Sequence, residues 1–237
     1  MLESLSREWQ LVFLTAATAA ALPLGAALAA IPGFGPDWLQ REFRHFAIAV
    51  GAGVMLGAAA VSLVPEGQAA LGDPRLSVAW LLAGGFVVFA LERWISQQRR
   101  TEPQLMGMLL DFVPENLALG GLVMAKPEAA WALAWMIGLQ NLPEGFNSFR
   151  ELSQAGARRW RNFLFMLSLV ALGPILGLAG MTVLGEHETW LGAVMLASSG
   201  GILYLMFQDI APQVKLERHW APPLGAVLGF GISMLGA

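Results

Sequence analysis

The chain has no cysteine, and only 13% of its 237 residues are charged. Without cysteine, disulfides, thiolate metal ligands and cysteine nucleophiles are excluded. A soluble domain carries about 25% charged residues, so the scarcity of charge argues against that class of protein. Long polar loops and low-complexity segments are also lacking. We therefore expect neither a soluble domain nor a regulatory tail.

Long apolar segments dominate what is present, since 56% of the residues are hydrophobic and the mean hydropathy is +0.59. A run of about 20 apolar residues crosses a hydrocarbon core roughly 30 Å thick. We predict an all-α polytopic membrane protein with a single domain over 1–237. Its eight transmembrane helices are expected at residues 10–31, 46–64, 76–96, 104–125, 129–149, 162–184, 189–212 and 220–237.

Two details refine this prediction. The first apolar run is interpreted as an uncleaved span, because Glu3, Arg7 and Glu8 do not form the positive region of a signal peptide. Pro222 and Pro223 predict that the eighth helix is short or starts late.

Basic residues are unevenly distributed over the predicted loops. Of the 14 Lys and Arg residues, only Arg7, Arg75 and Lys126 fall on one side, and the others fall on the opposite side. Cytoplasmic loops are enriched in Lys and Arg. The imbalance predicts an even number of spans with both termini outside the cytoplasm. We expect the protein to lie in the cell (inner) membrane.

Few polar side chains are placed deep in the predicted spans. An ionisable group at that depth costs roughly 3 kcal/mol or more, so it usually faces the bundle interior and marks a site or a pathway. The acids at such depth are Asp111, Glu115, Glu144 and Asp209, and their polar neighbours are Gln140, Asn141 and Gln208.

The same short pattern occurs in the fourth and fifth predicted helices: an oxygen-bearing side chain, a proline three residues later, and then a glutamate. The spacing of four residues puts both oxygen-bearing groups on one helical face. The proline frees a backbone carbonyl and bends the helix, which is tolerated where the backbone lines a cavity. The two occurrences are Asp111, Pro114, Glu115 and Gln140, Pro143, Glu144.

The two patterns are expected at the same depth, because the helices over 104–125 and 129–149 are joined by a short loop and pack antiparallel. Together they supply three carboxylates and one amide oxygen, which are hard ligands for a divalent cation. A cation or protons would relieve the repulsion between the carboxylates. The alternative is that these prolines only kink the helices and that their acids bond to neighbouring helices.

Weaker signals lie in the second and seventh predicted helices. "SLVPEG", which contains Glu66, and "FQDIAPQ", which contains Gln208 and Asp209, repeat the proline–acid theme as a possible pathway, as paired irregular helices do in transporters. For Glu66 the alternative is ordinary helix-end chemistry. Met55 is either an apolar filler or a thioether bordering a metal path.

Several of these segments resemble one known family. "GLQNLPEGFNS" and "LLDFVPENLALGG", supported by "GAGVMLGAAAVSLVPEG", "FALERW" and "SSGGILYLMFQDIAP", are similar to the motifs of the ZIP (Zrt/Irt-like) divalent metal transporters. The resemblance covers nearly the whole chain.

The resemblance implies an inverted-repeat bundle of eight helices, a homodimer in a lipid bilayer, and inward transport of a divalent cation. Zn²⁺ is expected first, with Mn²⁺, Fe²⁺ and Cd²⁺ as alternatives. It implies that the first, fourth, fifth and sixth helices move as one unit. The implied metal site is Asp111, where the family usually has His, with Glu115, Gln140, Asn141 and Glu144. Met55 resembles a methionine near the entrance.

Besides Asp111, the sequence departs from the family at three further positions. Phe112 replaces an Asn, Asn116 replaces a Gly, and Gly173 stands where several members have a glutamate, which puts the second metal position of the family in doubt. The alternatives are a ZIP-like protein that binds metal without moving it and an intramembrane metal-dependent hydrolase. Because the chain has no HExxH motif, we expect no enzyme, and we expect no nucleic-acid partner.

Overall fold

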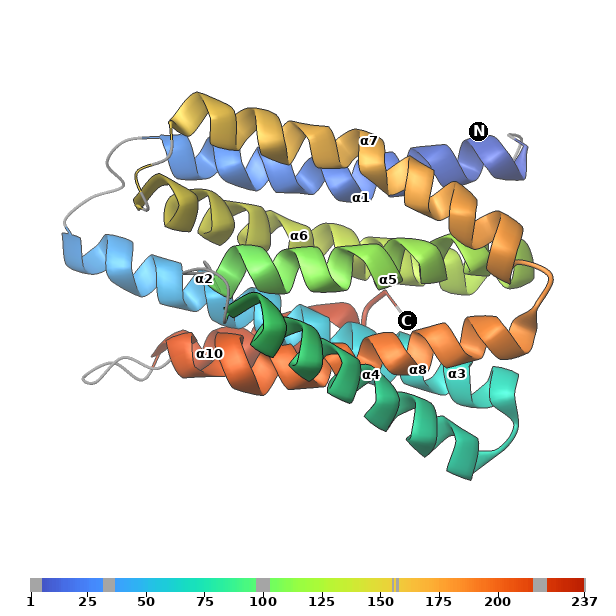
Figure 1. The fold of residues 1–237 in the computed structure, drawn as a ribbon. Helices are drawn as coiled ribbons and strands as arrows, with labels where there is room; N and C mark the ends of the chain where they lie inside the picture. The colour runs from blue at the N-terminus through green and yellow to red at the C-terminus, as the bar shows by residue number, and fades with distance from the viewer. Residues whose placement is uncertain are drawn as a thin grey trace.

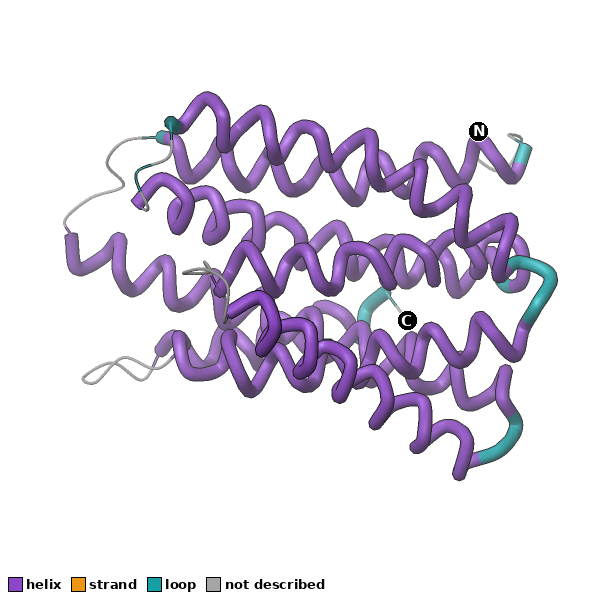
Figure 2. Tube along the Cα trace, viewed as in Figure 1, coloured by secondary structure: helices purple, strands orange, loops and turns teal. Residues whose placement is uncertain are grey.

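The structure is a computed structural model that describes residues 6–31, 37–96, 103–154, 156, 158–214 and 221–236. The helices lie side by side as an elongated bundle (Figure 1). Helices joined by short loops account for the regular structure, and no strand occurs in the described residues (Figure 2). The all-α prediction is confirmed.

Eight continuous helices make up this part of the chain, and two of them contain a π-helical segment. The π-helical segments are η2 and η3. The helices are α1 (Arg7–Ala30), α2–η2–α3 (Asp37–Gly57, Ala58–Leu63, Val64–Leu71), α4 (Pro74–Ser96), α5 (Pro103–Ala125), α6 (Pro127–Gln154), α7 (Arg159–Leu184), α8–η3–α9 (Glu188–Leu205, Met206–Ile210, Ala211–Val214) and α10 (Ala221–Ser233).

The observed bounds differ from the predicted ones mainly in length. The segment predicted at 46–64 is the middle of a helix that extends from 37 to 71, and the segment predicted at 129–149 extends to 154. A hydropathy pattern marks only the apolar part of a helix, whereas each further residue still gains a backbone hydrogen bond. The last helix is shorter than predicted and ends at Ser233. Residues 220 and 237 of that prediction lie outside the described residues.

In the part of the chain that the structure describes, six helices are long and apolar enough to cross a membrane, judged by length and composition: Arg7–Ala30, Glu42–Leu71, Pro74–Ile95, Leu105–Ala125, Arg159–Leu184 and Glu188–Val214. The α6 helix is not among them, because its second half carries polar residues such as Gln140, Asn141 and Glu144. The 13 residues of α10 are fewer than the roughly 20 that a span needs. The chain is a multi-pass membrane protein in which α6 is the most polar of the long helices.

The helices pack as two groups. The site group contains α1, α5, α6 and α7, and the support group contains α2–η2–α3, α4, α8–η3–α9 and α10. In Figure 1, α5 and α6 lie between α1 and α7 on one side and the support group on the other. Small residues bring helices into close contact: a methyl group at Gly145 would come within 2.2 Å of Leu22 O in α1. The site group is the set of helices that the resemblance implies as one unit.

Both π-helical segments are followed by a proline. In η2 the N–H of Val64 bonds to Ala59 O, one residue before Pro65. In η3 the N–H of Ala211 bonds to Met206 O, one residue before Pro212. A proline ring clashes with the carbonyl four residues earlier, and a wider turn relieves this clash. The irregularity predicted in the second and seventh helices is therefore present, although as widened turns rather than broken helices.

Several basic residues gather at one end of the bundle. Arg7 donates hydrogen bonds to Val123 O and Met124 O near the end of α5, both at 2.9 Å, and Lys126 follows directly. The N-terminus and the α3–α4 turn, before Arg75, lie at this same end (Figure 1). The three basic residues that the sequence assigned to one side do share one end of the molecule.

Candidate metal centre

The α5–α6 hairpin places the two proline–acid patterns side by side. Only Lys126 separates the two helices. The amide Nε2 of Gln140 donates to Glu115 Oε1 at 2.7 Å, and both residues are almost completely buried. Nearer the other end, Leu105 N donates to Glu151 Oε2 at 3.1 Å. These two bonds define the antiparallel register.

This register brings Asp111 and Glu144 to one level, since each lies four residues from the Glu115–Gln140 pair. Asp111 interacts electrostatically with both Glu115 and Glu144, and Glu144 interacts with Glu115. None of the three carboxylates forms an ion pair in the described part of the chain. Three acids therefore repel one another without a basic side chain to compensate them.

Several oxygens of this group are buried and have no hydrogen-bond donor among the described residues. They are Asp111 Oδ2, Gln140 Oε1 and both carboxylate oxygens of Glu144. Asp111 is only 3% exposed, so bulk water does not replace the missing donors. Leaving a buried polar atom unpaired costs about 1–3 kcal/mol. All four atoms are acceptors, so either protons or a cation would satisfy them.

The carboxylates do not form a closed coordination shell in this conformation. Among the described residues, no group of three or more His, Asp or Glu side chains is arranged to hold a metal ion. Glu115 is engaged by the Gln140 amide, and oxygen ligands would have to come within about 2.0–2.6 Å of a metal. Metal binding by three of these side chains therefore requires them to move closer together.

Asn141 and the two prolines have other contacts. Asn141 Nδ2 donates to Thr18 O at 2.9 Å and so ties α6 to α1 instead of facing Glu115. Pro114 and Pro143 both lie inside continuous helices. Pro143 also packs on α2, where a methyl group at Gly51 would lie 2.9 Å from its Cγ. Asn141 and Pro143 thus hold α6 against α1 and α2.

Asn116, which in the sequence is only a departure from the Gly of the family motif, is a further candidate ligand. It is completely buried, its Nδ2 donates to Phe112 O at 2.8 Å, and its Oδ1 has no donor. The facing residue of α7 is Gly173, where a methyl group would lie 3.4 Å from Asn116 Oδ1 and 2.9 Å from Thr15 O. Gly173, at the position where several family members have a glutamate, thus borders the site but has no side chain to offer as a ligand. The amide of Asn116 is the polar group next to it.

The three predicted pathway residues lie in surroundings that differ from those of the buried acids, and Met55 meets the α5–α6 hairpin only through apolar packing. Met55 is buried in the main hydrophobic cluster of the bundle. Gln208 is exposed, and Asp209 is half-buried in η3, where it interacts electrostatically with Glu92 of α4. Rotation of the helix about its axis, which hydropathy does not specify, turns Asp209 toward α4.

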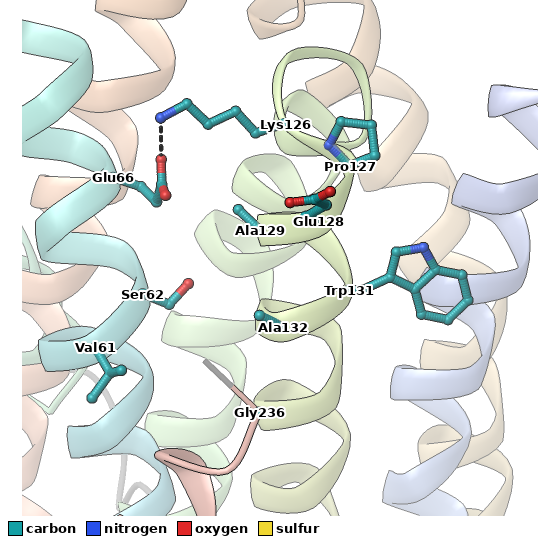
Figure 3. Close-up of a pocket in the computed structure, with 10 residues that line it drawn as sticks. All are labelled: Val61, Ser62, Glu66, Lys126, Pro127, Glu128, Ala129, Trp131, Ala132 and Gly236. Atoms are coloured by element: carbon teal, nitrogen blue, oxygen red, sulfur yellow. Dashed lines mark hydrogen bonds and ion pairs between the residues drawn. The ribbon is translucent and has the colours of Figure 1, made fainter. Parts of the chain in front are cut away.

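A cavity of about 790 Å³ opens between the η2–α3 segment and the start of α6. Lys126 reaches across it to Glu66, with Nζ 2.5 Å from Oε2, and so links the two helix groups (Figure 3). Ser62, Glu128 and Trp131 also line this space. The sequence pattern around Glu66 indicated a possible pathway or ordinary helix-end chemistry. It did not indicate the ion pair with Lys126, because Lys126 is distant in the sequence.

Comparison with known proteins adds the family. A search of curated proteins finds no match to the chain. Residues 98–236, which include α5 to α10 and both proline–acid patterns, match the family described as ZIP zinc transporter. The match covers more than half of the chain, and the family consists of membrane metal transporters rather than enzymes. The chain belongs to the ZIP zinc transporter family.

Proposed function

We propose that the protein moves a divalent transition-metal cation, Zn²⁺ in the first place, into the cytoplasm and binds it between α5 and α6. Asp111, Glu115, Gln140 and Glu144 supply the oxygen ligands, and Asn141 holds α6 against α1. The observation that carries the proposal is the set of buried acceptor oxygens on Asp111, Gln140 and Glu144 that have no donor. A cation that enters this space satisfies them and removes the repulsion between the carboxylates.

Alternating access would take place by motion of the site group against the support group. Contacts within the site group support its movement as one unit, because Asn141 bonds to Thr18 O of α1 and Arg7 bonds to the end of α5. Across the boundary between the groups, Lys126 and Glu66 form a partly exposed ion pair. Such a pair contributes at most about 1 kcal/mol, so it opposes a relative motion weakly.

The ligand set does not restrict the cargo to zinc. It consists of oxygens only, since Asp111 stands where the family usually has His. Carboxylate and amide oxygens also suit Mn²⁺ and Fe²⁺, and imidazole would favour Zn²⁺. We propose Mn²⁺, Fe²⁺ and Cd²⁺ as further cargo, to be ranked by competition for uptake.

We propose that the end of the bundle with Arg7 and Lys126 faces outside, since few basic residues lie there. Gly236 lines the same cavity as Lys126, which supports a location of both termini toward this end. The π-helical segments before Pro65 and Pro212 support an inverted repeat of the two halves. The exposed apolar face of α4 would meet lipid or, in a homodimer, a second copy.

Uptake of metal by proteoliposomes tests the proposal. Glu144→Ala should lower Zn²⁺ uptake by about tenfold or more, as expected when a charge-assisted contact of about 1.5–3 kcal/mol is lost. Glu186→Gln, which changes an exposed acid in the α7–α8 turn, is the matched control and should transport normally. Equal uptake by wild type and Glu144→Ala would remove this site from the mechanism.

A second candidate is a ZIP homologue that binds metal without moving it. The observation that favours it is Gly173, which supplies no side chain at the border of the site. Metal binding in detergent together with no flux in vesicles would support this candidate over transport.

A further inference from the structure

The polar face of α6 continues past Glu144 toward the end of the helix at Gln154. Asn147 and Ser148 follow Glu144 by three and four residues, and Glu151 follows by seven. Residues with these spacings share one helical face. At 1.5 Å per residue, Asn147 and Ser148 lie about 5–6 Å beyond Glu144 along the helix axis. A polar stripe therefore leads from the candidate site toward the end opposite Lys126.

The first two residues of this stripe are buried and unsatisfied. Asn147 is 1% exposed and Ser148 is 0% exposed, yet within the described part of the chain Asn147 Oδ1 and Ser148 Oγ have no hydrogen-bond partner. Several other buried serines are satisfied within their own helix, as in α8, where Ser199 Oγ donates to Met195 O at 2.9 Å, whereas Ser153 Oγ near the end of α6 is unpaired like that of Ser148. The orientation of Ser148 is thus not the default for a serine in a transmembrane helix. Unpaired buried oxygens indicate a ligand or water that visits the position.

The facing wall of α5 leaves room there. The register defined by the Gln140–Glu115 and Leu105–Glu151 bonds puts Gly107 and Met108 level with Asn147 and Ser148. Gly107 is buried, but a methyl group added to it would meet no atom within 4 Å. Space and unpaired oxygens therefore occur at the same level.

We propose that Asn147 and Ser148 form a second cation position, one turn from Glu144 on the cytoplasmic side, which receives the partly hydrated divalent cation as it leaves the carboxylates. This inference rests on the proposed transport function. Neutral amide and hydroxyl oxygens attract a cation less than carboxylates do, which suits a site that must be favourable to enter and weak enough to leave. The carboxylate of Glu151 comes next, at the end of the stripe.

The paired variant Asn147→Leu with Ser148→Ala removes both oxygens. It should lower the maximal rate of Mn²⁺ and Zn²⁺ uptake by proteoliposomes about tenfold, the effect of losing one interaction of ordinary strength. Equilibrium binding of the same ions in detergent should stay within about twofold of wild type, because the carboxylates are intact. Ser199→Ala, a buried serine with a satisfied hydroxyl, is the control for the loss of a hydroxyl.

Two results of this experiment would overturn the inference. One is uptake equal to wild type in the paired variant. The other is a parallel fall of binding and uptake, which would mean that Asn147 and Ser148 only support the structure around Glu144.

The absence of cysteine allows a second measurement that does not require transport. Ser148→Cys introduces the only thiol of the chain. A membrane-impermeant thiol reagent should modify it from the cytoplasmic side, and saturating Mn²⁺ should slow the reaction. Failure of modification, or modification that Mn²⁺ does not slow, would exclude the second cation position at Asn147 and Ser148. If wild type took up no metal, the proposed function would fail, while the protection by Mn²⁺ would still decide whether a cation occupies this position.

Discussion

Two regions of the molecule treat acidic side chains in opposite ways. At the end of the bundle, Glu66 is paired with Lys126 at 2.5 Å, although the side chains are 28% and 49% exposed and water could solvate both. Between α5 and α6, Asp111 and Glu115 are at most 3% exposed and have no basic partner among the residues that the structure describes. The exposed acid thus has a basic partner, although an exposed ion pair adds little to stability. The buried acids have none among the described residues, although an unpaired buried charge costs the most stability.

This difference separates a structural role from a ligand-binding role. Selection for stability alone would place a basic residue beside Asp111 or replace the acid with an apolar residue. The buried acids are explained if a mobile cation supplies the missing charge. The following predictions test this interpretation by moving features of one region to the other.

The largest effect is expected when a permanent cation is built into the buried site. Gln140→Lys would put an ammonium group next to Glu115, where the Gln140 amide now lies. We expect uptake to fall about a hundredfold or more, because a tethered charge worth a few kcal/mol competes with the metal. Thermal unfolding in the absence of metal should occur at an unchanged or higher temperature. Gln140→Met controls for the loss of the amide, and normal uptake by Gln140→Lys would contradict the location of the site.

A smaller effect is expected when one buried charge is removed. Glu144→Gln lowers the repulsion with Asp111 and Glu115, so the metal-free protein should unfold at a higher temperature than wild type. Added Zn²⁺ should stabilise wild type by mass action and should stabilise the variant less. Thermal unfolding in detergent, with and without Zn²⁺, measures both. If Zn²⁺ stabilised the two proteins equally, Glu144 would not be a ligand.

The smallest effect is expected at the exposed pair. Lys126→Met should change the free energy of unfolding by no more than about 1 kcal/mol, because exposed ion pairs contribute little. The difference from wild type should shrink at high salt, where exposed charges are screened. Unfolding measured at low and high salt checks this, and the charge swap Lys126→Glu with Glu66→Lys should restore the wild-type value. A loss as large as that expected for Gln140→Lys would mean that the two regions do not differ as described.

Sequence patterns were sufficient for the helices and for the hairpin that carries the candidate site. Apolar runs predicted eight helices. The prediction that the two proline–acid patterns lie at the same depth agrees with the contact between Glu115 and Gln140 in the antiparallel α5–α6 pair. Both inferences depend on local features: the length of an apolar run, a spacing of four residues and a short loop. Asn147 and Ser148 could have been found by extending the same spacing one turn past Glu144.

Long-range packing decided the rest. Asn141 bonds to α1, Met55 lies in the hydrophobic core, and Asp209 faces Glu92. The direction of a side chain depends on how each helix is rotated against its neighbours, and hydropathy in a largely apolar chain barely constrains that rotation. The helix bounds at 37 and 71 were missed because helical hydrogen bonds continue where the apolar run stops.

The sequence by itself therefore determined which segments form the long, mostly apolar helices and which two helices carry the acids, because a bilayer demands long apolar helices and tolerates few charges. Only the tertiary structure decided which oxygens lack a donor. That property depends on every atom within hydrogen-bond distance, and the atoms around Glu144 and Asn147 come from helices far apart in the chain.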